Sequence, residues 1–192
     1  MILTRVVPSA LVCRAAVLLV FAAATARAQA AMVILVRHAD KAAAPAADPE
    51  LTDAGRQRAQ DLAAALRDAG VRTVITTQFA RTRLTAEPLA ASAGITPTAI
   101  AASRDVKAHA AEIAAAIRSR PGGDVVLVVG HSNTVPAIIA ALGGPTIPDL
   151  CDSEYASLFV LQLSPSGARL VRGRYGAADA ADPKCSPPRG MN

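Results

Sequence analysis

The chain has 192 residues with a formal net charge of +5, and aromatic residues make up only 3% of it. This length suits one domain with a substantial core. Three of the 20 basic residues and none of the 15 acidic residues lie in residues 1–28, so the remainder carries a net charge of only +2. Because no basic run with interleaved aromatic residues is present, the composition argues against a nucleic-acid partner.

Residues 1–28 are predicted to be a secretory signal rather than part of the fold. Two arginines flank the start of a short apolar block at 15–24, and Ala26-Arg27-Ala28 places small residues at the positions that a signal peptidase reads. The block is shorter than the ~20 residues that span a bilayer. Cleavage after Ala28 is therefore favoured over retention as a membrane anchor, and the mature protein is expected to be periplasmic or secreted, with no membrane span.

Strands and helices alternate along the rest of the chain. Apolar runs rich in Val and Ile predict buried strands at 32–37 and 125–130. The segment 157–173 reads as a hairpin with a Ser-Pro-Ser-Gly turn. Further strands are predicted at 71–77 and 95–101, and helices at 52–69, 82–93, 105–119 and from 134 to the glycine pair at 143–144.

This order of elements predicts an α/β fold. We expect a three-layer α/β/α sandwich with a mainly parallel central sheet and a C-terminal β-hairpin edge. The domain is expected to span 29–176, followed by a C-terminal tail at 177–192 rich in Ala, Pro and Gly.

Basic side chains follow three of the predicted strands. Arg37 and His38 end the first, Arg81 follows the second, and His131 follows the strand at 125–130. Since the carboxyl ends of parallel strands meet at one sheet edge, these residues are expected to converge there. Arginine forks bind phosphate oxygens, and a neutral imidazole can accept a phosphoryl group. Each residue alone also fits a solvated loop position, and His109 is expected on a helix surface.

Four segments in order resemble the histidine phosphatase (phosphoglycerate mutase-like) superfamily. "LVRHADK" is similar to its Arg-His-Gly signature, and "LTDAGRQRAQDLAAAL" to its Leu-Thr-x-x-Gly helix. "TTQFARTRLTAEPLA" resembles its Ser-x-x-x-Arg-x-x-x-Thr-Ala segment, and "VVLVVGHSNTVPAIIAAL" the segment with its second histidine. The resemblance implies a three-layer α/β/α fold, His38 as the phosphorylated nucleophile, and a phosphate pocket made by Arg37, Arg81 and His131.

Two positions depart from the family pattern. Ala39 stands where the signature has glycine, and since alanine tolerates positive φ less well, the turn after His38 is expected to differ. The family's proton donor is usually a carboxylate some way beyond the second arginine. Asp105 is the candidate, with Glu112 and Asp40 as alternatives, although Asp105 also fits a helix-opening residue that stabilises the helix dipole.

Two cysteines remain after the signal segment. In an oxidising compartment Cys151 and Cys185 are expected to form a disulfide that ties the tail to the body, against the alternative of two free thiols. No Cys or His cluster suggests a metal site, and no cofactor is expected.

The sequence thus predicts an exported, metal-independent phosphatase that hydrolyses phosphate monoesters through a phosphohistidine on His38. The expected substrate is a small phosphorylated compound, with envelope phosphosugars favoured by export. Two alternatives stay open: a non-catalytic phosphate-binding envelope protein that retains the pocket, and a phosphohistidine phosphatase.

Overall fold

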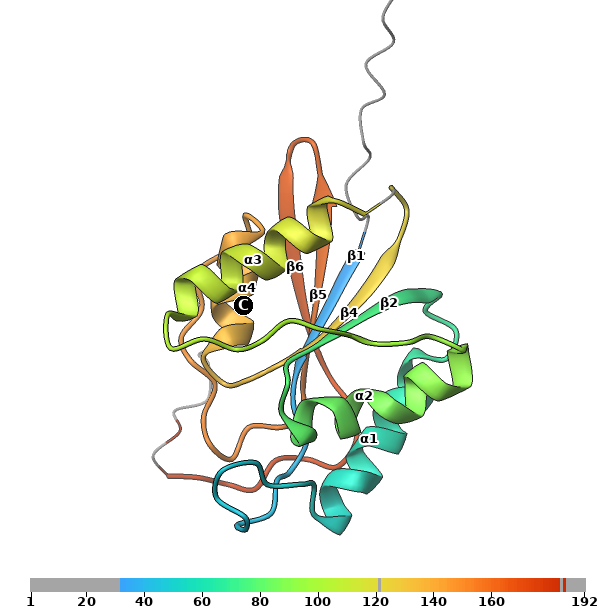
Figure 1. The fold of residues 1–192 in the computed structure, drawn as a ribbon. Coiled ribbons are helices and arrows are strands. Elements are labelled where there is room, and N and C mark those ends of the chain that lie inside the picture. Colours follow the sequence, from blue (N-terminus) through green and yellow to red (C-terminus); the bar gives the residue numbers. More distant parts are fainter. Residues whose placement is uncertain (1–31, 121, 184, 186–192) are drawn as a thin grey trace, which may run out of the picture.

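Six strands form one central sheet in the order β3-β2-β4-β1-β5-β6 (Figure 1). The computed structural model describes residues 32–120, 122–183 and 185, so the predicted signal segment 1–28 lies outside the described residues. The strands are β1 (Met32–Arg37), β2 (Val71–Thr76), β3 (Thr98–Ala99), β4 (Val125–Gly130), β5 (Ser157–Ser164) and β6 (Gly167–Arg174).

The sheet is parallel in its first part and antiparallel at one edge. Strands β1 to β4 pair in parallel, whereas β5 runs antiparallel to β1 and continues through a tight turn into β6. The mainly parallel sheet with a C-terminal hairpin edge is therefore confirmed. The hairpin runs from Ser157 to Arg174, and only its outer strand lacks a second neighbour.

Two helices cover each face of the sheet (Figure 1). The pair α1 (Asp53–Leu66) and α2 (Ala80–Ala93) lies on one face, and α3 (Val106–Arg118) and α4 (Thr134–Ala141) lie on the other. Each pair closes its own apolar core, one against the Ile34 side of β1 and the other against the Leu35 side. The three-layer α/β/α sandwich is thereby confirmed.

The helix boundaries follow from local chemistry. The hydroxyl of Thr52 accepts a hydrogen bond from Gly55 N at 3.0 Å and caps α1. Gly94 adopts a left-handed conformation and ends α2, which runs through Pro88 without ending there. None of the helices in the described part of the chain is both long and apolar enough to cross a membrane.

His109 is buried, so its predicted surface position is wrong. It lies on α3 four residues before Ile113 and eight before Ile117, which places all three on one helix face. That face packs into the core, and His109 is only 1% exposed. The helical spacing of His109 from Ile113 and Ile117 therefore determines its burial, in spite of the polarity of the imidazole.

Candidate active site

The pairing of β1 with β4 brings the two histidines together. Arg37 lies opposite Gly130 in the register, and the backbone N–H of His38 donates to the carbonyl oxygen of Gly130 at 2.9 Å. The chain leaves both strands at the same sheet edge, and the ring centroids of His38 and His131 are 5.5 Å apart. The sheet register alone therefore makes them neighbours, as the strand ends predicted.

One ring nitrogen of His38 is hydrogen-bonded to the backbone, and the other is available to a ligand. Its Nδ1 lies 2.9 Å from the carbonyl oxygen of Ala39. A carbonyl can only accept, so Nδ1 carries the proton and Nε2 carries the lone pair. Burial lowers the pKa of His38 to about 3, helped by the positive charges of Arg37 and Arg81 and by His131, while the Ala39 hydrogen bond opposes this. His38 is a neutral imidazole at neutral pH.

The segment after His38 is fixed by close packing against α1 and α2. Ala39 is fully buried, and its N–H donates to the Thr85 hydroxyl at 2.9 Å. A Cβ on Gly55 would be 2.1 Å from the carbonyl oxygen of Asp40, so the helix start needs glycine there. No non-glycine residue among those described has a positive φ, so Ala39 does not adopt the conformation that alanine tolerates poorly.

Arg37 offers a buried guanidinium donor to the pocket. Its Nη1 donates to three carbonyl oxygens, those of Cys151 at 2.6 Å, Asp152 at 3.0 Å and Glu154 at 3.2 Å. The guanidinium stacks on the Tyr155 ring, 4.2 Å from its centroid. Its Nε is buried and has no hydrogen-bond partner. Its Nη2 donates to the Tyr155 hydroxyl at 3.4 Å and lies 3.9 Å from Asp152, so Nε is the donor left available for an oxyanion.

Arg81 offers a second buried donor from the first turn of α2. Its guanidinium stacks on Phe79, 4.1 Å from the ring centroid, and Nη1 lies 3.8 Å from Asp48. Its Nε is buried without a partner. Burial lowers the pKa of Arg81, Arg37 acts in the same direction, and Asp48 opposes both. A desolvated guanidinium with an unused donor favours an anionic ligand.

His131 is the fourth member of the cluster. Its Nε2 lies 3.1 Å from the hydroxyl of Thr77, at the end of β2, and its backbone N–H donates to the hydroxyl of Thr134 at 2.8 Å. Burial lowers the pKa of His131 to about 4, and the positive charges of Arg81 and Arg37 and the nearby His109 add to this. The pocket therefore combines two neutral imidazoles with two guanidinium groups.

Asp105 lies apart from this cluster in its contacts. It is exposed and caps α3, where its Oδ1 accepts from the N–H of Ala108 at 2.9 Å. This is the helix-opening role that was the alternative prediction for Asp105. Asp105 as a proton donor stays a prediction.

Three residues that contact the site were not predicted from the sequence: Thr77, Asp48 and Tyr155. Asp48 accepts from Ala80 N with both carboxylate oxygens, at 2.9 and 3.2 Å, and so anchors the loop at 42–50 to the start of α2. Tyr155 lies beside Arg37 only because the chain returns there after α4. No periodicity or motif marks these positions, although Tyr155 is one of only two tyrosines in the chain.

The predicted disulfide is present. Cys151 and Cys185 are bonded, with 5.9 Å between their Cα atoms, and the tail is thereby tied to the loop that precedes β5. Within the described residues, no group of three or more His, Cys, Asp or Glu side chains is placed to hold a metal ion.

Stability is expected to fall as the pH drops below neutrality. The folded-state pKa values of His38 and His131, about 3 and about 4, lie below the ordinary value of 6.5. Between the folded and unfolded pKa values, the unfolded chain therefore binds more protons than the folded chain. The contribution of the two neutral imidazoles to the free energy of unfolding is complete above pH 6.5 and is lost as the pH falls toward 4. We expect a loss on the order of 3 kcal/mol for each histidine, about 6 kcal/mol for the two, between pH 7 and pH 4, measured by urea unfolding. Unfolding of a His38→Gln variant should show a smaller pH dependence, and an unchanged one would contradict this assignment.

Comparison with known proteins agrees with this geometry. The family model described as histidine phosphatase superfamily (branch 1) matches residues 33–104. No curated protein matches the chain. Among solved structures, the protein histidine phosphatase SixA complexed with tungstate is 21% identical, with a TM-score of 0.60 over 74% of this chain and 96% of that one.

Two further solved structures share the fold. The putative phosphohistidine phosphatase SixA from Agrobacterium tumefaciens is 24% identical, with a TM-score of 0.58 over 78% of this chain and 99% of that one. Mycobacterial glucosyl-3-phosphoglycerate phosphatase Rv2419c is 18% identical, with a TM-score of 0.60 over 78% of this chain and 100% of that one. At these identities the likeness establishes the fold.

Proposed function

We propose that the chain is a metal-independent phosphatase of the histidine phosphatase superfamily that acts through His38; the family model matches residues 33–104, and the solved phosphatases share the fold. One observation carries the proposal. A buried neutral imidazole, with Nδ1 tied to Ala39 and Nε2 available, stands beside two guanidinium groups whose buried Nε donors have no partner. Such donors suit the equatorial oxygens of a phosphoryl group.

The reaction would proceed in two displacements. The lone pair on His38 Nε2 attacks phosphorus, a nitrogen–phosphorus bond forms, and the bond to the leaving oxygen breaks. The guanidinium groups of Arg37 and Arg81, each with an unpartnered Nε, neutralise the charge on the equatorial oxygens. Water then attacks the phosphohistidine, which releases inorganic phosphate and a proton and restores neutral His38.

The leaving group separates two substrate classes. Asp48 lies beside Arg81, but both of its carboxylate oxygens already accept from Ala80 N, so it serves there as an acceptor. Asp105 caps α3. Substrates whose leaving groups need little protonation, such as aryl phosphates, are therefore favoured over alkyl phosphates. Phosphohistidine belongs to the same group because imidazole leaves readily, which makes a phosphohistidine phosphatase the second candidate.

The cellular setting is part of the proposal. The predicted signal segment and the Cys151–Cys185 bond both fit an oxidising compartment, so we place the enzyme in the periplasm or outside the cell. Its substrate would then be a small phosphorylated compound. Export favours envelope phosphosugars, whereas the leaving-group argument favours aryl phosphates and phosphohistidine, so the substrate panel includes all three.

The test is a substrate panel combined with trapping of the intermediate. The protein is incubated with 32P-labelled aryl phosphate, sugar phosphate and phosphohistidine, quenched in base and analysed for protein-bound label. We expect hydrolysis together with a base-stable, acid-labile adduct, as phosphohistidine requires. Turnover without any adduct would overturn the mechanism. Binding of phosphate with no hydrolysis of any substrate would favour a non-catalytic phosphate-binding protein.

A further inference from the structure

The orientation of Arg37 depends on one short loop. We call residues 151–155 the Arg37 loop, because its carbonyl oxygens accept all three hydrogen bonds from Arg37 Nη1 and its Tyr155 ring stacks on the guanidinium. These contacts fix the orientation of the Arg37 guanidinium. A shift of the loop would therefore turn the guanidinium and misalign the donors that phosphate needs.

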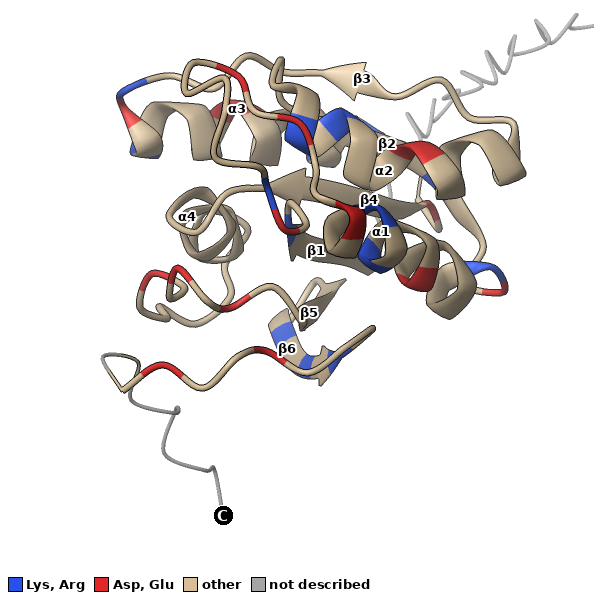
Figure 2. Cartoon of the chain, turned by 90° about the horizontal axis from the view of Figure 1, so that it is seen from below, with Lys and Arg blue, Asp and Glu red and all other residues tan. Residues whose placement is uncertain are grey.

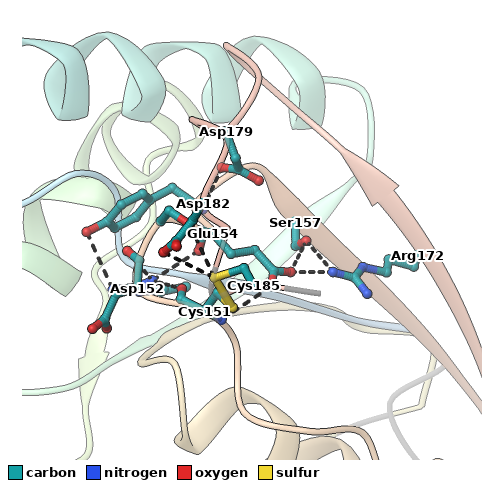
Figure 3. The surroundings of a disulfide bond; sticks show 11 residues. Cys151, Asp152, Glu154, Ser157, Arg172, Asp179, Asp182 and Cys185 are labelled. Atoms are coloured by element: carbon teal, nitrogen blue, oxygen red, sulfur yellow. Dashed lines mark hydrogen bonds and ion pairs between the residues drawn. A yellow bond between two sulfur atoms is a disulfide. The ribbon is translucent and has the colours of Figure 1, made fainter. Parts of the chain in front are cut away.

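The Arg37 loop is in turn held by the C-terminal strap, which we define as residues 176–183 and 185. Cys185 of the strap is bonded to Cys151 at one end of the loop. At the other end, Asp179 Oδ1 accepts from the N–H of Tyr155 at 2.7 Å and from that of Ala156 at 2.8 Å. Figure 3 shows the disulfide and the Asp179 carboxylate on either side of the same short stretch of chain.

The strap also reaches the segment that carries the nucleophile. Arg58 donates through Nη1 to the carbonyl oxygen of Ala177 at 2.8 Å and through Nε to Asp40 Oδ2 at 2.7 Å. Asp40 lies two residues after His38. The strap thus contacts both halves of the phosphate site, one through Arg58 and the other through the Arg37 loop.

Few packing contacts hold the strap. Most of its described residues are exposed, and a cavity of about 650 Å³ lies between the strap, the Arg37 loop and β6, lined in part by Cys151, Arg172 and Asp179. Its acidic segments pass beside the basic bands of β6 (Figure 2), where Arg174 pairs with Asp179 at 3.1 Å. Because the strap buries little apolar surface, its hold on the Arg37 loop depends on the disulfide and the Asp179 hydrogen bonds.

We propose that the C-terminal strap positions Arg37 for phosphate binding, with the Cys151–Cys185 bond and Asp179 as its two attachments to the Arg37 loop, so that reduction of the disulfide weakens the phosphate pocket. In that reaction a dithiol transfers two electrons and two protons to the disulfide; Cys151 and Cys185 become thiols and the dithiol becomes a cyclic disulfide. The loop then loses one of its two attachments to the strap, while Glu154 of the loop keeps its ion pair with Arg172 of β6. This inference rests on the phosphate pocket of the proposed function.

The test measures the Kd of inorganic phosphate by calorimetry at 20 °C, with and without dithiothreitol, and with circular dichroism to show that both forms are folded. We expect reduction to weaken phosphate binding about tenfold, the effect of losing one well-placed charged contact. The Cys151→Ser/Cys185→Ser variant should match the reduced protein and should not respond to dithiothreitol. In an Arg37→Ala background, reduction should change the Kd less than twofold.

Asp179 offers a matched pair of variants. Asp179→Asn keeps a side-chain oxygen for the N–H groups of Tyr155 and Ala156 but loses the charge that pairs with Arg174, whereas Asp179→Ala loses both. We expect Asp179→Asn to bind phosphate like the wild type and Asp179→Ala to bind it about fivefold to tenfold more weakly.

Three outcomes would overturn the inference. Reduction could lower the melting temperature while the phosphate Kd stays unchanged, which would make the strap a stabilising element only. Reduction could weaken binding equally in the Arg37→Ala background, which would place the effect elsewhere in the pocket. If the oxidised protein binds no phosphate at all, the proposed function fails together with this inference, whereas binding that ignores reduction leaves the proposed function intact.

Discussion

Replacing His38 by alanine is expected to abolish turnover, with kcat lower by at least about 10⁴-fold. The reason is that no neighbouring group can take over the attack. His131 engages Thr77 through its Nε2, and the two arginines carry no lone pair that could attack phosphorus. Initial rates with an aryl phosphate, measured at enzyme concentrations high enough to detect a residual 10⁻⁴ activity, decide the matter.

The same variant separates catalysis from binding. Arg37 and Arg81 keep their stacking partners Tyr155 and Phe79 when His38 is shortened, so inorganic phosphate should still bind within about tenfold of the wild-type Kd. The labelled adduct, however, should disappear. An adduct that persists in His38→Ala would mean that another residue is phosphorylated, and would refute the assignment of the nucleophile.

The residues at the centre of the site could be predicted because the topology of a parallel sheet determines where they lie. Arg37, His38 and His131 sit directly at the ends of continuous apolar strands, and adjacent parallel strands end at one edge. Arg81 lies in the first turn after β2, close enough to the same edge for the argument to hold. No knowledge of side-chain packing was needed for these four positions.

The supporting residues could not be predicted because their positions depend on long-range returns of the chain. Tyr155 lies 118 residues from Arg37 in the sequence. It contacts Arg37 only because the Arg37 loop passes beside the end of β1. Asp179 belongs to a segment whose composition resembles an unstructured tail. The two cysteines were the one sequence signal that the tail contacts the Arg37 loop. They predicted that the tail is attached to the body, but not that the attachment orients Arg37.

Arg81→Ala is expected to lower kcat/KM by about 10²-fold to 10³-fold, the usual effect of removing one preorganised donor from a developing anion. Arg81 Nε is buried and unpartnered, so it is available to phosphate in a way that an exposed arginine is not. The helix provides its own control, because Arg83 lies in the same turn of α2 and is exposed. Arg83→Ala should keep kcat/KM within about twofold of wild type.

A third variant at this position distinguishes charge from geometry. Arg81→Lys keeps the positive charge but replaces the planar fork by a single ammonium, so it should recover only part of the activity lost in Arg81→Ala. Phosphate affinity should follow the same order in all three variants, because the contact is made to the phosphoryl group itself. Equal losses in Arg81→Ala and Arg83→Ala would show that the effect is one of net charge around α2, and the assignment of Arg81 to the phosphate pocket would fall.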